Sequence, residues 1–292
     1  MTTSGTCLSG DDPGGEPERL VFFLGGRDLE MLAIGALLRQ SGARLHDRAP
    51  DWSQASISFY RPEVENLKRD QVPVLVELAN DLQLQPCIAV DHHQGRAGAE
   101  RPTSLHQVFQ LLRLPSHRWT RWHELVAAND RGYIPAMREV GADAVEIRRV
   151  RDADRAAQGI DEEHDREARR ALSALQLRSD GCLAVARLGH GKTAALTDLL
   201  DPAYGGSGYK NLLIASPNEL NFFGAGGLVL ALARAFPGSW FGGSLPERGF
   251  WGVRTDHLES DLGKAASLIE KALSPQAPQS ARVRESRRRS IT

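Results

Sequence analysis

The sequence has little of what marks secreted, membrane-spanning or polycationic proteins. Its 292 residues include only three cysteines, Cys7, Cys87 and Cys182, with no C-x-x-C pair. We therefore expect neither a disulfide framework nor a thiolate zinc site. Lys plus Arg is 36 and Asp plus Glu is 37, and this net charge of −1 excludes nucleic-acid binding by bulk charge alone. The longest charge-free apolar run, from Phe222 to Ala233, is far shorter than the ~20 residues of a membrane span. These absences favour a reduced, cytoplasmic protein with no membrane segment.

In the first half of the chain, strand-like apolar runs alternate with helix-like ones. The run at 20–26 is typical of a short buried strand that ends in a glycine pair, and 31–42 has apolar residues at helical spacing. Two further strand-like runs lie at 72–78 and 87–90, and helices are expected at 104–114 and 121–129. This alternation predicts an α/β fold whose N-terminal domain contains a doubly wound parallel sheet.

The second half begins with a stretch dense in Arg, Glu, Asp and Ala, from Ala144 to Leu175. It predicts one or two solvated helices that link two domains. A strand at 181–188, a helix at 193–200, a strand at 211–216 and a glycine-rich stretch at 224–252 then predict a smaller α/β domain, across a cleft from the first. The expected boundaries are a disordered leader at 1–18, the first domain at 19–143, the linker at 144–178, the C-terminal domain at 179–260, and a helix with a basic tail at 261–292.

Titratable side chains gather where the predicted strands end. Asp91-His92-His93 follows the strand at 87–90 directly, and acids also occur at or just beyond the ends of other predicted elements, namely Asp28, Glu30, Glu77 and Asp130. Because ligands of open parallel sheets bind at the carboxyl ends of the strands, we expect these side chains to converge there. Carboxylates mixed with imidazole suit manganese, iron or zinc, and two such cations can clamp a phosphoryl group for hydrolysis.

At these residues the chain resembles the DHH phosphoesterase superfamily, which includes RecJ-type exonucleases, nano-RNA phosphatases and cyclic-dinucleotide phosphodiesterases. Asp28 lies 63 residues and Glu77 14 residues before Asp91, in the order of that family's motifs. The expected strand at 212–216 and the stretch Pro237–Gly252 are similar to parts of its DHH-associated C-terminal domain, in which such a stretch would be a glycine-rich loop that holds phosphate. The resemblance covers roughly residues 19–255 of the chain.

The resemblance implies a phosphoesterase that uses two divalent ions, with manganese expected first and magnesium or another divalent ion as the alternative. It implies a small nucleotide or short oligonucleotide as substrate and leaves a homodimer open. Asp91 would orient an imidazole, and His93 and Arg248 would be catalytic residues that touch the substrate. Gly242 and Gly243 would bind the substrate together with Arg248. The implied metal ligands are Asp28, Glu30, Glu77, His92 and Asp130.

Four departures from the family pattern keep a second interpretation open. The usual D-x-D is Asp28-Leu29-Glu30, with Leu24 where many members have histidine. Glu77 replaces an aspartate, and no histidine occurs between Gly238 and Gly252. The alternative is a catalytically degenerate DHH-fold protein that binds a nucleotide or a partner without turnover. Asp28 and Glu30 would then be only the cap and first-turn acid of a helix.

Two other patterns leave alternatives. Gly191-Lys192-Thr193 follows a predicted strand and resembles a phosphate-binding P-loop, but Ala186 stands where the first glycine belongs. A P-loop nucleotide-binding protein is therefore a third hypothesis. Four aromatic residues near the C-terminal glycines are either a base-stacking wall or ordinary core, namely Trp240, Phe241, Phe250 and Trp251.

Overall fold

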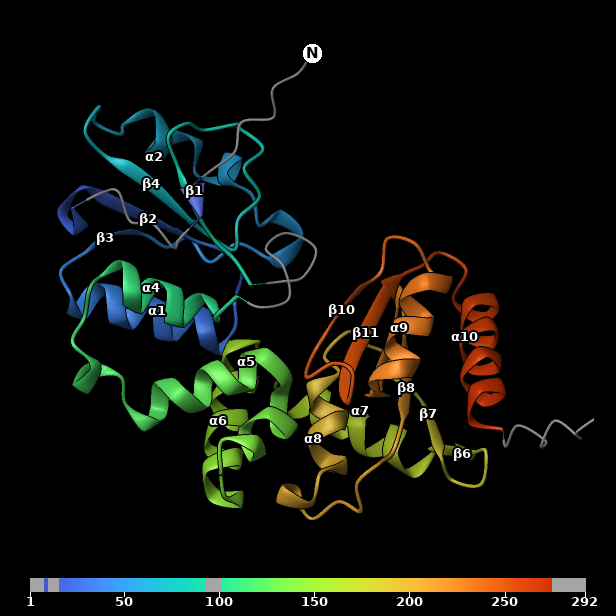
Figure 1. The fold of residues 1–292 in the computed structure, drawn as a ribbon. Coiled ribbons are helices and arrows are strands. Elements are labelled where there is room, and N and C mark those ends of the chain that lie inside the picture. Colours follow the sequence, from blue (N-terminus) through green and yellow to red (C-terminus); the bar gives the residue numbers. More distant parts are fainter. Residues whose placement is uncertain (1–7, 10–15, 93–100, 275–292) are drawn as a thin grey trace, which may run out of the picture.

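The computed structural model describes residues 8–9, 16–92 and 101–274, which form two β-sheets with helices packed against them (Figure 1). The N-terminal sheet has the order β1-β5-β4-β2-β3, and all neighbouring strands are parallel. The predicted doubly wound parallel sheet is thereby confirmed. Its strands are β1 (Leu8–Ser9), β2 (Leu20–Leu24), β3 (Arg44–His46), β4 (Val72–Val76) and β5 (Ile88–Val90).

Both faces of this sheet are covered, which explains why its strands are nearly continuous apolar runs. On one face Phe22 belongs to a core shared with the longer helices, and on the other Phe23 packs in a separate core with Ile57 and Tyr60. Strand β3 was not expected from the sequence, because it is a three-residue edge strand whose mostly polar residues show no strand pattern. The helical elements of this part are α1 (Leu29–Gln40), α2 (Arg61–Glu65), α4 (Ser104–Leu111), α5 (Arg121–Glu139) and the 3-10 turns at 17–19, 52–54, 57–60 and 116–118.

The second sheet is mixed, with the order β10-β11-β9-β8-β7-β6, and only β7 and β8 are parallel neighbours. The segment expected to be a glycine-rich loop instead contains two antiparallel strands, in which Trp240 pairs with Gly252. A side chain at Gly252 would overlap the Trp240 ring, so packing accounts for that glycine. The strands are β6 (Gln176–Arg178), β7 (Leu183–Arg187), β8 (Leu212–Ser216), β9 (Glu219–Ala225), β10 (Trp240–Gly242) and β11 (Arg248–Arg254), and the helical elements are α8 (Ala194–Leu200), the 3-10 turn at 202–204, α9 (Gly226–Ala235) and α10 (Leu258–Leu273).

The charged stretch forms two helices, α6 (Ala144–Ala157) and α7 (Glu162–Ser173). The prediction that it is merely solvated is wrong for α6, because Arg151 and Asp154 are buried. Helix α6 contacts α1 and α5 on one side and α8 on the other. In Figure 1, α5 and α6 accordingly lie between the N-terminal elements and the second sheet.

The cysteines, the chain termini and the lengths of the helices were also subjects of expectations from the sequence. Cys87 is disulfide-bonded and Cys182 is a free cysteine, so the expectation of a reduced protein is wrong for Cys87. Within the predicted leader, Leu8–Ser9 pairs with β5 and Pro17–Arg19 forms a 3-10 turn, whereas the rest of residues 1–15 lies outside the described residues, as does the basic tail from 275. Among the described helices, none is long and apolar enough to span a membrane.

Candidate functional site

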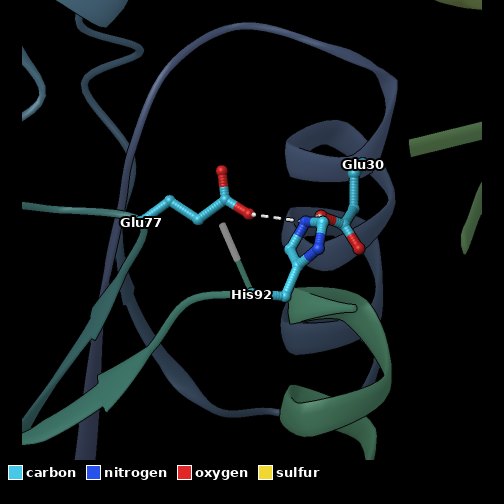
Figure 2. Close-up of side chains that lie close together, drawn as sticks. All are labelled: Glu30, Glu77 and His92. Carbon is cyan, nitrogen blue, oxygen red and sulfur yellow. Dashed lines mark ion pairs between the residues drawn. The ribbon is translucent and has the colours of Figure 1, made fainter. Parts of the chain in front are cut away.

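Four of the five predicted metal ligands meet at the carboxyl end of the N-terminal sheet. The Nε2 atom of His92 lies 2.6 Å from Asp130 Oδ2, 3.5 Å from Glu77 Oε1 and 3.9 Å from Glu30 Oε2. Glu30, Glu77 and His92 each present a ligand atom, and these three atoms lie within 4.8 Å of one another. Figure 2 shows their side chains directed toward a common point, with Glu30 on α1 and the other two on segments that follow strands.

Local backbone structure directs each acid into this cluster. Asp28 caps α1 by accepting a hydrogen bond from the Met31 backbone N–H at 2.8 Å, which places Glu30 in the first helical turn. Glu77 has a left-handed backbone with φ 52°, a conformation that costs a non-glycine residue about 1–3 kcal/mol. Its backbone N–H donates to Val90 O at 2.8 Å, so the bend is held against the end of β5.

The N-terminus of α4 fixes the two glutamates. The hydroxyl of Ser104 donates a buried hydrogen bond to Glu77 Oε1 at 2.7 Å. The backbone N–H of Leu105 donates to Glu30 Oε1 at 2.8 Å, also in a buried setting. Unpaired N–H groups at a helix N-terminus favour negative charge. The first turn of α4 therefore orients both carboxylates and leaves their second oxygens for other partners.

Burial and mutual repulsion disfavour the ionised forms of the acids in this cluster. Burial, and next the charges of Asp130 and Glu77, raise the pKa of Glu30 well above its usual value. The same causes raise the pKa of Asp28, and Asp154 adds to the effect. Oxygen Oε2 of Glu30 is buried and accepts no hydrogen bond from any described residue. A bound divalent cation would supply the missing positive charge, and this oxygen-rich donor set with one imidazole fits such an ion.

The remaining predicted residues have differing positions. Asp91 is buried, with 7% of its surface exposed, and its backbone carbonyl accepts a hydrogen bond from Gln107 at 3.2 Å. Besides burial, the charges of Asp130 and Glu77 act on Asp28 and raise its pKa, although Asp28 is not in the group formed by Glu30, Glu77 and His92. His93 lies outside the described residues.

A buried ion network that the sequence did not indicate lies directly behind the cluster. Arg151, 1% exposed, donates from Nη1 to Asp154 Oδ2 at 2.8 Å and to Asn129 Oδ1 at 2.9 Å. Its other edge holds both oxygens of Asp198, at 3.0 and 3.2 Å. The Leu29 backbone N–H donates to Asp154 Oδ1 at 3.2 Å, so the network reaches the first turn of α1. An Arg and an Asp three residues apart on an otherwise polar helix gave no sign of this burial.

A cavity of about 390 Å³ lies between a kink in α5 and the second sheet. The kink falls at Gly132 and Tyr133, and Tyr133 has a left-handed backbone with φ 55°. Arg248 and Gly243 line this cavity, whereas Gly242 is not among its lining residues and packs beneath Phe250. That these three residues bind a substrate stays a prediction. The lining adds cationic, aromatic and acidic side chains, including Arg138, Tyr133, Tyr209, Phe223, Asp198 and Asp201.

Arg248 is held in place at this cavity. Its guanidinium donates to the carbonyl oxygens of Lys210, at 3.0 Å, and Tyr209, at 3.2 Å, and lies over the Tyr209 ring. Of the four C-terminal aromatic residues, Trp251 is fully buried, Phe250 lines the cavity, and Trp240 is 40% exposed. Trp251 is therefore part of the core, whereas Phe250 and Trp240 have exposed surface on which a base could stack.

The P-loop-like segment has ordinary structural contacts. The Lys192 ammonium donates to the carbonyl of Gln158, just beyond α6, at 2.7 Å. Its backbone N–H donates to Nδ1 of His190 at 3.1 Å. A lysine bound to a neighbouring helix end does not resemble one that reaches for a phosphate, so these contacts weaken the P-loop hypothesis.

Comparison with solved structures identifies the fold. No family model and no curated protein matches the sequence. The DHH domain of PF0399, a member of the s1p family of ribosomal proteins, is similar with a TM-score of 0.55 and 12% identity, covering 89% of this chain and 88% of that one. An exopolyphosphatase-related protein from Bacteroides fragilis is similar with a TM-score of 0.50 and 14% identity, covering 88% and 92%. Together with the two sheets and the cluster at the end of β5, these likenesses show that the chain has the fold of DHH-domain proteins.

Proposed function

We propose that this chain is a divalent-metal-dependent phosphoesterase of the DHH superfamily. Its substrate would be a phosphodiester or phosphomonoester of a small nucleotide or short oligonucleotide, cleaved with two divalent ions. The observation that carries the proposal is the meeting of Glu30, Glu77, Asp130 and His92 at one sheet edge, where burial and mutual repulsion disfavour the ionised carboxylates. The similarity to an exopolyphosphatase-related protein also favours phosphate chemistry.

In this proposal Asp28, Glu30, Glu77, His92 and Asp130 hold the two ions, with manganese expected first. When bound, the ions neutralise the phosphate and lower the pKa of attacking water. The chain supplies the geometry: Ser104 and Leu105 keep the two glutamates oriented, and Asp91 is expected to orient an imidazole. His93 is proposed to touch the reacting phosphate.

The cavity beside the α5 kink is proposed to take the part of the substrate that does not react. Arg248 offers a fixed cation there, Gly242 and Gly243 keep the backbone near it open, and Tyr133 and Phe250 offer ring faces. Charge-assisted hydrogen bonds from arginine are well suited to phosphate oxygens. A homodimer and a cytoplasmic location stay predictions.

The test is hydrolysis of dinucleotides, short oligonucleotides and a chromogenic phosphodiester, with and without Mn²⁺, by the wild type, His92→Ala and the exposed-histidine control His257→Ala. We expect manganese-dependent turnover that His92→Ala abolishes and His257→Ala retains, with all three proteins folded. Wild-type protein that binds nucleotides but hydrolyses none of these substrates under any divalent ion would support the degenerate alternative. Retention of turnover by His92→Ala would remove His92 from the metal site.

A further inference from the structure

Trp52 is a large aromatic side chain that the proposed chemistry does not use. It begins a short 3-10 turn, Trp52–Gln54, and is 44% exposed, one of the few large apolar side chains with that much accessible surface among the described residues. A core tryptophan would be largely covered, so packing of the core alone does not account for this side chain.

One face of the Trp52 indole lies on the backbone at Gly26. A Cβ built on Gly26 would come within 2.2 to 2.6 Å of Cδ2, Cε2 and Cε3 of the ring. Cδ2 and Cε2 are the two fusion atoms, which an approach in the plane of the ring would meet only after the peripheral atoms. The glycine is therefore under one face of the ring.

The turn that carries Trp52 is attached to the segments that carry the acids. Ala79, two residues beyond Glu77, donates to Ala55 O at 3.0 Å, and Ile57 donates to Ala79 O at 2.9 Å. The Tyr60 hydroxyl donates to Leu24 O at 2.6 Å. The segment that carries Trp52 is thus hydrogen-bonded to the backbone of both acidic segments.

These contacts place Trp52 at the rim of the carboxylate cluster. Gly26 is two residues before Asp28, so their Cα atoms are at most about 7 Å apart. Gly25 in turn packs so closely on the backbone carbonyl of Glu77 that an added Cβ would lie 2.9 Å from it. Arg27, which follows Gly26 in the chain, is exposed.

We propose that Trp52 is a stacking platform for a nucleobase, and therefore a specificity-determining residue for substrates with a base next to the reacting phosphate. The proposal rests on the proposed function. A phosphate bound at the cluster leaves its base one ribose away, within reach of a ring at the rim. Stacking on an aromatic side chain tolerates any base, because every base has a π-face. Gly26 is required since a side chain there would displace the platform.

The test compares two substrates in four proteins. The substrates are a dinucleotide and the same compound lacking the base next to the scissile phosphate. The proteins are wild type, Trp52→Ala, Trp52→Phe and Leu177→Ala, the last removing an exposed apolar side chain from β6, in the second sheet. Trp52→Ala should raise KM for the dinucleotide by roughly 5- to 100-fold at nearly unchanged kcat, the range expected for one lost base–aromatic stack.

The control variants and the substrate without the base have definite expected results. Trp52→Phe should remain close to wild type because it retains a ring, Leu177→Ala should match wild type, and the substrate lacking the base should be insensitive to Trp52→Ala. Equal effects of Trp52→Ala on both substrates, or no effect on either, would overturn the platform.

A binding measurement separates this proposal from the proposed function. Calorimetry with a dinucleotide whose bridging ester oxygen is replaced by methylene reports binding without turnover. If the wild type hydrolyses nothing but binds this compound in a manner that Trp52→Ala weakens and Trp52→Phe preserves, the platform stands and the phosphoesterase assignment fails. Binding that does not depend on Trp52, or no binding at all, overturns the platform.

Discussion

At the scale of single residues, the site concentrates features that a stable fold would otherwise avoid. Glu77 adopts a left-handed backbone, and Glu30 holds a buried carboxylate next to other acids. Both features destabilise the metal-free protein, and both belong to residues that are proposed to hold a metal ion. The residues that define the site are therefore expected to limit stability until a cation binds.

Glu30→Gln tests this trade directly. The fold raises the pKa of Glu30, so the folded protein binds a proton there more tightly than the unfolded chain does. This stabilisation of the fold is complete below the ordinary carboxyl pKa and is lost as the pH rises through the raised pKa. In the metal-free state at pH 8 the variant should be more stable than wild type by on the order of 1 kcal/mol, or about 2–4 °C in Tm, and the gain should shrink at acidic pH.

Thermal unfolding between pH 4 and 8, with and without Mn²⁺, measures this effect. With Mn²⁺ the order should reverse, since the variant lacks an ionised ligand. Glu65→Gln, at an exposed position on α2, is the control and should change little. A metal-free Glu30→Gln protein less stable than wild type at pH 8 would contradict the account.

At the scale of elements, α4 connects the acidic segments of two different strand ends. Its first turn donates to Glu77 through Ser104 and to Glu30 through the Leu105 backbone. Ser104→Ala should raise the Mn²⁺ concentration for half-maximal activity by about 10-fold or more, as is usual when a ligand loses its supporting hydrogen bond. The kcat at saturating Mn²⁺ should be nearly preserved.

A manganese titration of initial rates checks this prediction, with Ser173→Ala as the control because that hydroxyl bonds only an exposed carbonyl of its own helix. An unchanged manganese requirement in Ser104→Ala would mean that Glu77 needs no such support. A proportional loss of kcat at saturating metal would instead assign Ser104 to the chemical step.

Most elements could be predicted from the sequence because apolar periodicity alone determines them. Strands β2 and β4 are continuous apolar runs, so the sequence predicted them. The cluster was predicted because acids follow these strands at the carboxyl end of a parallel sheet, in the order of the DHH motifs. The buried charges of α6 were not, since Arg151 and Asp154 look like the exposed charges around them. Strands β10 and β11 were taken for a loop because their glycines make room for aromatic rings rather than for turns.

At the scale of the whole molecule, one buried guanidinium links the two halves. Arg151 joins Asp154, which holds the first turn of α1, to Asp198 on α8 at the cavity wall. Arg151→Ala would leave two buried carboxylates with less compensation and should lower the free energy of unfolding by about 3–5 kcal/mol. Chemical denaturation measures this change. Arg166→Ala, which breaks an exposed ion pair, should cost less than about 1 kcal/mol, and equal losses in both variants would refute the role of burial.

In the proposed function, hydrolysis takes place at the first sheet, and the second sheet binds the part of the substrate that does not react. Arg248→Ala should therefore raise KM by roughly 10- to 100-fold, as expected for about 1.5–3 kcal/mol from a lost charged hydrogen bond, at nearly unchanged kcat. Initial rates on a short oligonucleotide and on a minimal chromogenic phosphodiester test this. Equal small effects on both substrates would remove Arg248 from the site.

The domain boundaries at 19–143, 144–178 and 179–260 stay predictions.

The central claim is that this acidic cluster is a site for two divalent ions, and metal content measures it most directly. Wild type and His92→Ala should be dialysed against buffered Mn²⁺ and analysed for bound manganese per chain. The account predicts two equivalents for the wild type and fewer for His92→Ala. No bound manganese in the wild type, with no other divalent ion taking its place, would contradict it.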